Sequence, residues 1–418
     1  MKNNISKIIV IVDSIDINDS SGSKMNVALI ENLNHSGYEV TVYHYTHKNI
    51  QLENIKCISI KEIKWSANYI LSRTQRLLFR HLKIEVSTFL ENKFGFSFTF
   101  FNDVNSIKRA FAEIKKQNPD LIITLSKGTS FRPHYALLSC SELHHKWIAN
   151  VHDPFPFHYA PSPYNWIEPG YDKKEKFFLE VSEKAQYSSF PSLLLKEWMG
   201  SYFPNFLKTG IVIPHQNTAH KPQNIKLPEY FDESKFNLLH AGHLMKQRSP
   251  EGLIEGFKLF LKQKPEARKQ SKLILLGHAA EYHTAMLEYY KKENPEIYIY
   301  NEYVDFDVIY TLQKKITVNI ILESKAEISP FLPGKFPHCV EANKPILSLS
   351  PYYSEVRRLL GNDYPYWSEV DDVEKIAGIF QGLFELWQEN PENLILNRGD
   401  LLDYLSVPYL KQVISNIK

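Results

Sequence analysis

The chain has 418 residues, 43% of them hydrophobic and 23% charged, which is the balance of a globular protein. This length is too great for one ordinary core and predicts two domains of about 200 residues each. The net charge of +2 argues against a nucleic-acid partner, and three scattered cysteines argue against a disulfide framework or a zinc site. No apolar run approaches the roughly 18 to 20 residues of a membrane span, so we expect a cytoplasmic protein.

Strands and helices alternate through the first half of the chain. A polar loop, residues 13–23, precedes a helix expected at 24–35. Short β-branched runs are typical of buried parallel strands, because such strands are covered on both faces. They predict strands at residues 7–12, 38–43, 120–125, 146–151 and 210–213.

The same alternation restarts after a polar, proline-containing stretch, residues 216–233, which is the predicted linker. Strands are expected at 236–241, 272–276, 297–300, 317–322 and 345–349, and helices at 250–262, 282–292, 305–314, 335–343 and 353–360. Strands alternating with helices indicate parallel sheets with right-handed crossovers. The predicted fold class is therefore α/β, with two doubly wound Rossmann-like domains facing a cleft and ligands at the carboxyl ends of the strands.

The domain boundaries follow from these patterns. We expect one domain at residues 1–215 and a second at 216–395. The remainder, 396–418, is a helical tail. The pattern does not decide which domain the tail joins, and packing back on the first domain is one arrangement.

A basic loop follows the first strand of the second half. Gly242 permits close approach of a ligand to the backbone. Arg248 comes just before Ser249 and Pro250, which suit the N-cap and first position of a helix. A diphosphate there would meet a helix dipole and a forked cation. The alternative is a capped turn with a solvated arginine.

A second loop of this kind precedes a helix at Lys335, directly after Gly334. His338 and Glu341 follow at three-residue steps, on or near one helix face. The lysine could neutralise phosphate, and the other two side chains could bind ribose or sugar hydroxyls. The alternative is a helix with ordinary surface polar residues.

Together these segments resemble the donor domain of bacterial family-4-type (group 1) GT-B glycosyltransferases. The resemblance implies that Arg248 and Lys335 contact the donor diphosphate, with His243 in the place of a frequent arginine. It also implies donor contacts for Gly242 and for Val304, the latter near the nucleobase. Many relatives carry two glutamates separated by seven residues; here those positions fall on His338 and near Pro330, so either His338 or Glu341 would bind the ribose.

The first half resembles the same family more weakly. Ser21-Gly22-Ser23 before a helix resembles the loop that opens these enzymes, so Gly22 would approach the donor phosphates or the acceptor. His152 and Asp153 follow a strand and resemble a basic-Asp-Pro turn of the family. They are our candidates for catalytic or sugar-orienting groups. The alternative is that Asp153 caps a turn and His152 packs in the interior.

Two further patterns have competing interpretations. Asp305-Phe306-Asp307 could be a metal-binding triplet, but its place before a helix favours an N-cap. Residues 65–89 form an amphipathic pattern whose basic positions are Arg73, Arg76, Arg80 and Lys83. This helix either lies on an anionic membrane, giving peripheral contact at its inner face, or packs on its sheet with the arginines in water.

The expected function is transfer of a sugar from a nucleotide-diphosphate sugar to a hydroxyl of a glycan or lipid-linked acceptor, in cell-surface polysaccharide assembly. No cofactor and no metal is expected, because Arg248 and Lys335 would stabilise the leaving diphosphate. A GT-B-fold sugar-nucleotide epimerase and a catalytically inactive nucleotide-sugar-binding subunit remain alternatives. A dinucleotide oxidoreductase would need GxGxxG after a strand, which neither half has.

Overall fold

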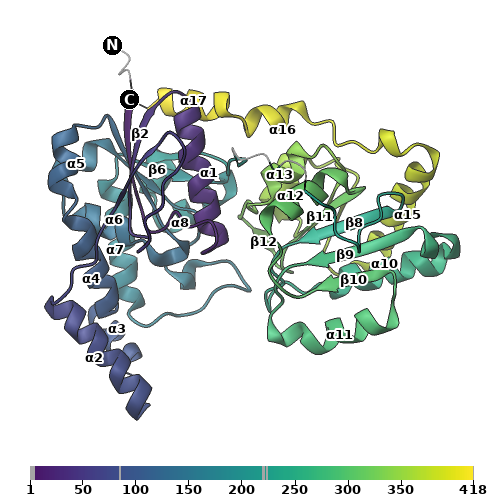
Figure 1. Ribbon diagram of the computed structural model, residues 1–418, viewed down its shortest axis with the longest axis horizontal. Coiled ribbons are helices and arrows are strands. Elements are labelled where there is room, and N and C mark those ends of the chain that lie inside the picture. The colour runs from purple at the N-terminus through teal and green to yellow at the C-terminus, as the bar shows by residue number, and fades with distance from the viewer. Residues whose placement is uncertain (1–4, 84–85, 219–221, 223–224, 418) are drawn as a thin grey trace. The chain divides into compact units, whose positions relative to one another are not determined.

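A computed structural model describes residues 5–83, 86–218, 222 and 225–417 (Figure 1). The chain divides into two compact units. Unit 1 comprises residues 1–160, 164–219 and 405–418, and unit 2 comprises 161–163 and 220–404. The expected linker, 216–233, lies partly outside the described residues.

Unit 1 is built on a parallel sheet in the order β3-β2-β1-β4-β5-β6-β7. Its strands are β1 (Lys7–Val12), β2 (Glu39–His44), β3 (Lys56–Ser59), β4 (Leu121–Leu125), β5 (Trp147–Asn150), β6 (Tyr187–Phe190) and β7 (Gly210–Val212). The order of the strands across the sheet changes direction between β1 and β4. These two strands are neighbours, with Val12 beside Leu125. Five of these strands were expected from the sequence, and β3 and β6 were not.

Two apolar layers cover this sheet, because alternate residues of β1 point to opposite faces. On one face Ile8 and Val10 pack against α1 (Ser21–His35) and α17 (Val407–Ser415). On the other, Ile9 and Ile11 join a core of large aromatic side chains. The helices that contribute to this aromatic core are α4 (Phe98–Lys108), α5 (Phe111–Gln117), α6 (Arg132–Leu138), α7 (Tyr171–Lys184), α8 (Leu193–Tyr202) and α9 (Asn205–Thr209).

Unit 2 repeats the architecture with the order β10-β9-β8-β11-β13-β15, again parallel. Its sheet strands are β8 (Phe236–Ala241), β9 (Ser271–Leu276), β10 (Ile297–Tyr300), β11 (Val318–Leu322), β13 (Ile346–Leu349) and β15 (Trp367–Ser368). A separate pair joins β12 (Ile328–Ser329) to β14 (Tyr353–Ser354). The helices are α10 (Glu251–Gln263), α11 (Thr284–Glu293), α12 (Phe306–Lys315), α13 (Phe336–Glu341), α14 (Glu355–Leu360), α15 (Val373–Glu389) and α16 (Gly399–Tyr404). The α/β prediction with two Rossmann-like domains is thus confirmed.

Short 3₁₀ turns connect several of these elements. They lie at Gly128–Ser130, Ser141–Lys146, Phe157–Tyr159, Pro265–Lys269, Glu281–His283 and Pro391–Asn393. The turn at Glu281–His283 leads into α11, so the helix expected from 282 begins at Thr284 instead.

The end of the chain divides between the two units. Helix α16 belongs to unit 2, whereas residues 405–418 belong to unit 1. There α17 crosses near the end of α1 (Figure 1), with Leu410 and Ile414 fully buried and the Tyr38 hydroxyl 3.4 Å from the Lys411 carbonyl oxygen. The segment that returns therefore begins at 405 rather than at 396.

The amphipathic pattern at 65–89 is not one helix. It forms α2 (Ala67–Leu82) and α3 (Ser87–Phe94), and Lys83 ends α2 in the left-handed conformation. Helix α2 contacts α4, and Ser72 is its single buried residue, so most of its side chains face solvent. Within the described residues, no helix combines the length and apolar content needed to cross a membrane.

Candidate functional site

The carboxyl ends of β8 and β11 form the centre of the candidate site in unit 2. These strands are neighbours, and the sheet order reverses between them. In open α/β sheets, such a reversal separates the loops on either side and leaves a crevice where ligands bind. Here Ala241 ends β8 and is followed by Gly242, while Leu322 ends β11 and is followed by Glu323.

Lys335 reaches this crevice from the N-cap position of α13. Its ammonium donates to the Ala241 carbonyl oxygen at 2.8 Å and lies 3.3 Å from Nδ1 of His240. Burial, with a smaller contribution from the nearby Arg248 guanidinium, lowers the pKa of Lys335 to about 7. Burial also lowers the pKa of His240, so that imidazole stays neutral beside the ammonium.

Arg248 belongs to the loop between β8 and α10. Its Nη1 donates to the His243 carbonyl oxygen at 3.3 Å, and its Nε is buried with no hydrogen-bond partner among the described residues. An unpaired buried N–H costs free energy, so a hydrogen bond from this guanidinium to an anionic ligand would be favourable. Ser249 accepts from the Glu251 N–H at 3.2 Å, but Pro250 occupies the N-cap position and α10 begins one residue later than expected.

Glu323 is a site residue that the sequence reasoning missed. Its side chain is buried, and its Oε1 has no hydrogen-bond partner in the part of the chain that the structure describes. Burial raises the pKa of Glu323 to about 7, against the opposing effects of Ser329 and Arg248. The available signal was its place, since an acidic residue directly after an apolar strand lies at the ligand edge of a parallel sheet.

The balance of charge suits an anionic ligand. Two basic side chains, Arg248 and Lys335, share the crevice with the Glu323 carboxyl group, and burial brings the pKa values of Lys335 and Glu323 to about 7, so each is about half protonated near pH 7. Within the described residues, the hydrogen bonds of both cations go to carbonyl oxygens and to His240 rather than to carboxylates. An entering diphosphate would supply the missing negative charge and would be held by charge-assisted hydrogen bonds.

Two other predicted donor residues lie at the edges of this region. His243 is exposed, with its ring 5.3 Å from that of His278. Burial, followed by His278 and Arg248, lowers its pKa, so it adds little positive charge at neutral pH. Val304 is partly buried and packs against the cluster that contains Leu276, at the carboxyl end of β9.

The two candidates for ribose binding both lie against α12. The Tyr310 hydroxyl donates to Glu341 Oε1 at 2.8 Å, and Lys314 lies 3.4 Å from the same oxygen. The His338 ring meets those of Phe306 and Tyr310 at centroid distances of 5.4 and 5.8 Å. Both side chains therefore contribute to the packing of α13 on α12.

The triplet at 305–307 has a structural role. Asp305 is the N-cap of α12, and its Oδ1 accepts from the Asp307 N–H at 2.8 Å. This geometry confirms that Asp305 acts as a helix N-cap. Among the described residues, no cluster of His, Cys, Asp and Glu side chains is arranged to hold a metal ion.

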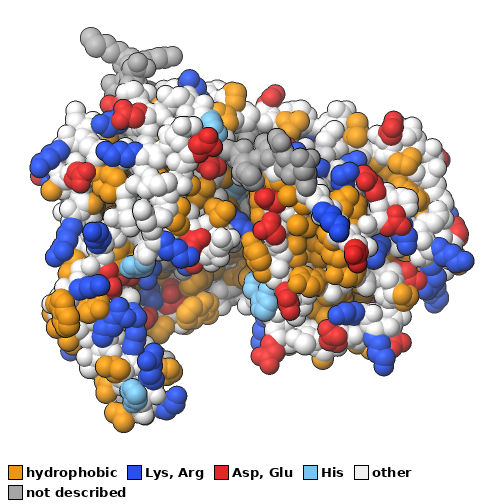
Figure 2. All heavy atoms as spheres, viewed as in Figure 1, with side chains coloured by type: hydrophobic (Ala, Val, Ile, Leu, Met, Phe, Trp, Pro, Cys, Tyr) orange, Lys and Arg blue, Asp and Glu red, His pale blue; other side chains and the backbone are white. Residues whose placement is uncertain are grey.

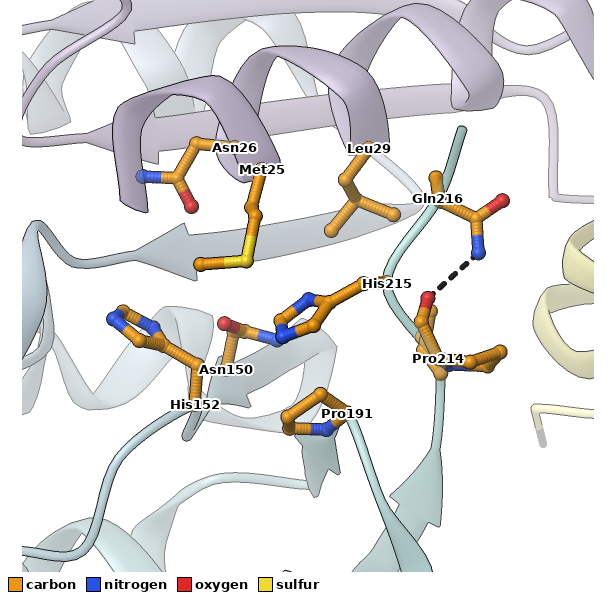
Figure 3. Close-up of a pocket in the computed structure, with 10 residues that line it drawn as sticks. Met25, Asn26, Leu29, Asn150, His152, Pro191, Pro214, His215 and Gln216 are labelled. Atoms are coloured by element: carbon orange, nitrogen blue, oxygen red, sulfur yellow. Dashed lines mark hydrogen bonds between the residues drawn. The ribbon is translucent and has the colours of Figure 1, made fainter. Parts of the chain in front are cut away.

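His152 and Asp153 lie in unit 1, directly beyond the carboxyl end of β5. His152 Nε2 is 3.3 Å from Asp153 Oδ2; the imidazole is buried, whereas the carboxylate is 38% exposed. Figure 3 shows His152 and His215 with Met25 in a pocket below α1. The pocket wall also includes Asn26, Leu29, Asn150, Pro191, Ile213, Pro214 and Gln216. His152 Nε2 makes no hydrogen bond within the described residues, so the contact with Asp153 is one of proximity. A neutral imidazole in such a pocket can accept a proton from a bound hydroxyl.

Gly22 is in the first turn of α1 rather than in a loop, because the helix begins at Ser21. The Ser20 hydroxyl caps it by accepting from the Ser23 N–H at 3.1 Å. A Cβ on Gly22 would lie 3.5 Å from the Gly128 backbone nitrogen, so this turn packs closely on the loop after β4.

Asp13 is a second residue that the sequence reasoning did not select. It follows β1 at the point where the sheet order of unit 1 reverses. Its Oδ2 accepts from the Lys127 N–H at 3.1 Å and from the Ser130 hydroxyl, which ties down the loop after β4. Burial raises the pKa of this carboxyl, and Oδ1 has no hydrogen-bond partner within the described residues.

Comparison with known proteins supports the fold and no closer relationship. No known protein-family profile matches the sequence, and no curated protein matches it. A glycosyltransferase from Rickettsia africae superposes with a TM-score of 0.60 at 13% identity, covering 98% of this chain and 96% of that one. HepE of Anabaena, in complex with UDP and glucose, gives 0.59 at 12% identity and 98% coverage of both chains. TarM gives 0.62 at 9% identity, covering 100% of this chain and 99% of its own.

These similarities define the class of fold. The chain has the GT-B fold, in which two Rossmann-like domains follow each other, and it shares that fold over essentially its whole length with glycosyltransferases. The two parallel sheets with the same strand order agree with this assignment.

Proposed function

We propose that the protein is a glycosyltransferase that moves a sugar from a nucleotide-diphosphate sugar to an acceptor hydroxyl. The observation that carries this proposal is the pair of cations, Lys335 and Arg248, at the reversal point of the unit 2 sheet. HepE, which has the same fold, was solved with UDP and glucose. A uridine nucleotide is therefore the first donor to test.

In this proposal the cations stabilise the negative charge that develops on the leaving diphosphate. Electrostatic stabilisation in a buried site is the main demand of such a transfer and is met without a metal ion. Gly242 permits the close backbone approach, and His243 and Val304 contact the rest of the donor. His338 or Glu341 binds the ribose. His152 accepts the acceptor's proton, and Asp153 orients the imidazole.

The finer assignments rest on the sequence pattern. The resemblance to bacterial family-4-type enzymes favours a hexosyl or related sugar and an acceptor in cell-surface polysaccharide. The same resemblance favours action at the inner side of the membrane. A glycan or lipid-linked acceptor fits that setting.

Ligand binding tests the donor site directly. We expect the purified protein to show a higher melting temperature with one nucleoside diphosphate and its sugar conjugate, because a ligand that binds the folded state stabilises it. Lys335→Ala should abolish this shift. Lys325→Ala is the matched control. Lys325 also lies between β11 and β13, but its side chain is 75% exposed and pairs with Asp371. Unchanged ligand binding by Lys335→Ala would contradict the proposal.

Turnover then separates the alternatives. Acceptor-dependent loss of the sugar nucleotide is the expected result. Conversion of the donor to an epimer without acceptor identifies an epimerase instead. Tight donor binding with neither hydrolysis nor transfer, across a panel of acceptors, identifies a binding subunit.

A further inference from the structure

Helices α2 and α3 carry an unusual amount of exposed apolar surface. They extend from the body of unit 1 in Figure 1, and Figure 2 shows hydrophobic and basic side chains together over them. Of the 24 large hydrophobic side chains exposed in the described chain, eight lie within 30 residues: Trp65, Ile70, Leu71, Leu77, Phe79, Leu82, Phe89 and Phe94. We call these eight residues the apolar patch. Single exposed apolar residues are common, whereas a contiguous group marks a binding surface.

Positive charge is concentrated in the first part of this segment, around α2. Residues 64–83 contain five basic residues, Lys64, Arg73, Arg76, Arg80 and Lys83, and no acidic one. This segment therefore carries +5, and the rest of the chain, whose total is +2, carries −3. The low net charge of the protein conceals a strongly basic element.

The contacts of α2 show which side faces outward. The buried side holds Ser72, and Arg76 donates to Thr99 of α4 at 3.1 Å. Ile70 and Leu77 are half exposed and seven residues apart, so they lie on one stripe. Arg73 and Arg80 repeat the same spacing on a stripe beside it. The outward side thus carries an apolar stripe, Ile70 and Leu77, with a cationic stripe along one of its borders.

We propose that α2 and α3 bind the surface of an anionic phospholipid bilayer. Apolar side chains of such an element enter the boundary between headgroups and acyl chains, and the cations pair with the acidic headgroups. A second copy of this chain fits less well, because the two positively charged surfaces, +5 each over residues 64–83, repel each other. Nucleic acid would use the cations but leave the aliphatic side chains, such as Leu77 and Leu82, in water.

A residue of α3 also lines a polar pocket in unit 1: Glu91 shares its wall with Lys127, Arg132, Glu168 and Lys174. Given the glycosyltransferase function proposed above, an acceptor anchored in the bilayer would meet the enzyme here. Membrane binding itself is tested without donor or acceptor, so its failure is distinct from failure of the proposed function.

Vesicle co-sedimentation of the full chain is the test. We expect binding to vesicles of phosphatidylcholine with roughly 30% phosphatidylglycerol, which approximates the negative charge of a cytoplasmic leaflet. This binding should weaken as the salt concentration rises, because salt screens the attraction. Vesicles of phosphatidylcholine alone should bind little protein. Arg73→Glu with Arg80→Glu should weaken binding about tenfold or more. The matched control is Lys291→Glu with Lys292→Glu, which makes the same charge change on exposed positions of α11 and should bind normally.

The apolar patch has its own variant and readout. Leu77→Ser with Leu82→Ser keeps the charge and should also weaken binding. Trp65 is 83% exposed, so its fluorescence should shift to shorter wavelength on vesicle binding, a change that Trp65→Phe removes. Absence of binding to anionic vesicles, equal loss in both charge variants, or self-association that the Leu77 and Leu82 substitutions abolish overturns the proposal.

Discussion

The ammonium group of Lys335 occupies the space beside the α-carbon of Gly242: a Cβ at position 242 would lie 3.0 Å from Lys335 Nζ. Two segments that are remote in sequence thus meet at van der Waals distance. Position 242 has room for a glycine and little more while Lys335 stays in place. The finding ties the loop after β8 to the start of α13.

Substitution of Gly242 should therefore damage the site and spare the fold. In Gly242→Ala the new methyl group displaces the end of the flexible Lys335 side chain, and we expect nucleotide-sugar affinity to fall about tenfold, or about 1.4 kcal/mol. Isothermal titration calorimetry measures the change. The control is Gly378→Ala in α15, where a Cβ meets nothing within 4 Å. It should leave affinity unchanged and stabilise the helix by about 0.5–1 kcal/mol.

Donor binding should weaken as the pH rises. Burial lowers the pKa of Lys335 and raises that of Glu323, each to about 7, so between pH 6 and 8 the site loses a positive charge and gains a negative one. Both changes oppose an anion, and a nucleotide sugar keeps its two phosphate charges across this range. Titrations at pH 6, 7 and 8 should show affinity decreasing. Glu323→Gln should show a shallower decrease, and affinity independent of pH would refute this electrostatic account.

Lys335 should reduce the stability of the free protein. Its pKa in the folded state lies below that of an unfolded lysine, because burial penalises the charge. The folded chain therefore binds fewer protons than the unfolded chain between about pH 7 and 10.5, and stability rises with pH through that window. The substitution Lys335→Met keeps a long, unbranched side chain but removes its charge. Its melting temperature should exceed that of the wild type, most strongly at pH 7 and below.

The excess should shrink as the pH rises from 7 and should vanish above about 10.5, where lysine becomes neutral in the unfolded state as well. The same variant should lose nucleotide binding. A melting temperature at or below the wild-type value at pH 6 would show that the hydrogen bond from Lys335 to Ala241 outweighs the burial of the charge.

His152 and Asp153 should affect turnover more than donor binding. Removal of a general base lowers kcat about 10²- to 10⁴-fold, so we expect His152→Ala to fall in that range and Asp153→Ala to fall less, because its carboxylate acts through the imidazole. Donor affinity should stay near the wild-type value in both variants. Full turnover by both would remove these residues from the mechanism. His145→Ala, on an exposed histidine of the same unit, is the control.

The sequence by itself determined the local elements and their order. Apolar β-branched runs such as Lys7–Val12 and Val318–Leu322 predicted parallel strands, because strands covered on both faces need such runs. The strands it missed are short, partly polar or at the sheet edge, as in Tyr187–Phe190 and Trp367–Ser368. Gly242, Arg248 and Lys335 were selected as candidates because loops after such strands lie at the ligand edge.

Only the tertiary structure decided how these loops combine. It placed Lys335 beside His240, 95 positions away, and added Glu323 to the same crevice. Burial there brings the pKa values of Lys335 and Glu323 to about 7. It also left the apolar patch of α2 and α3 exposed, although its periodicity equally fits a packed helix. The physical reason is that periodicity and capping depend on neighbouring residues, whereas burial and desolvation depend on which distant elements pack together.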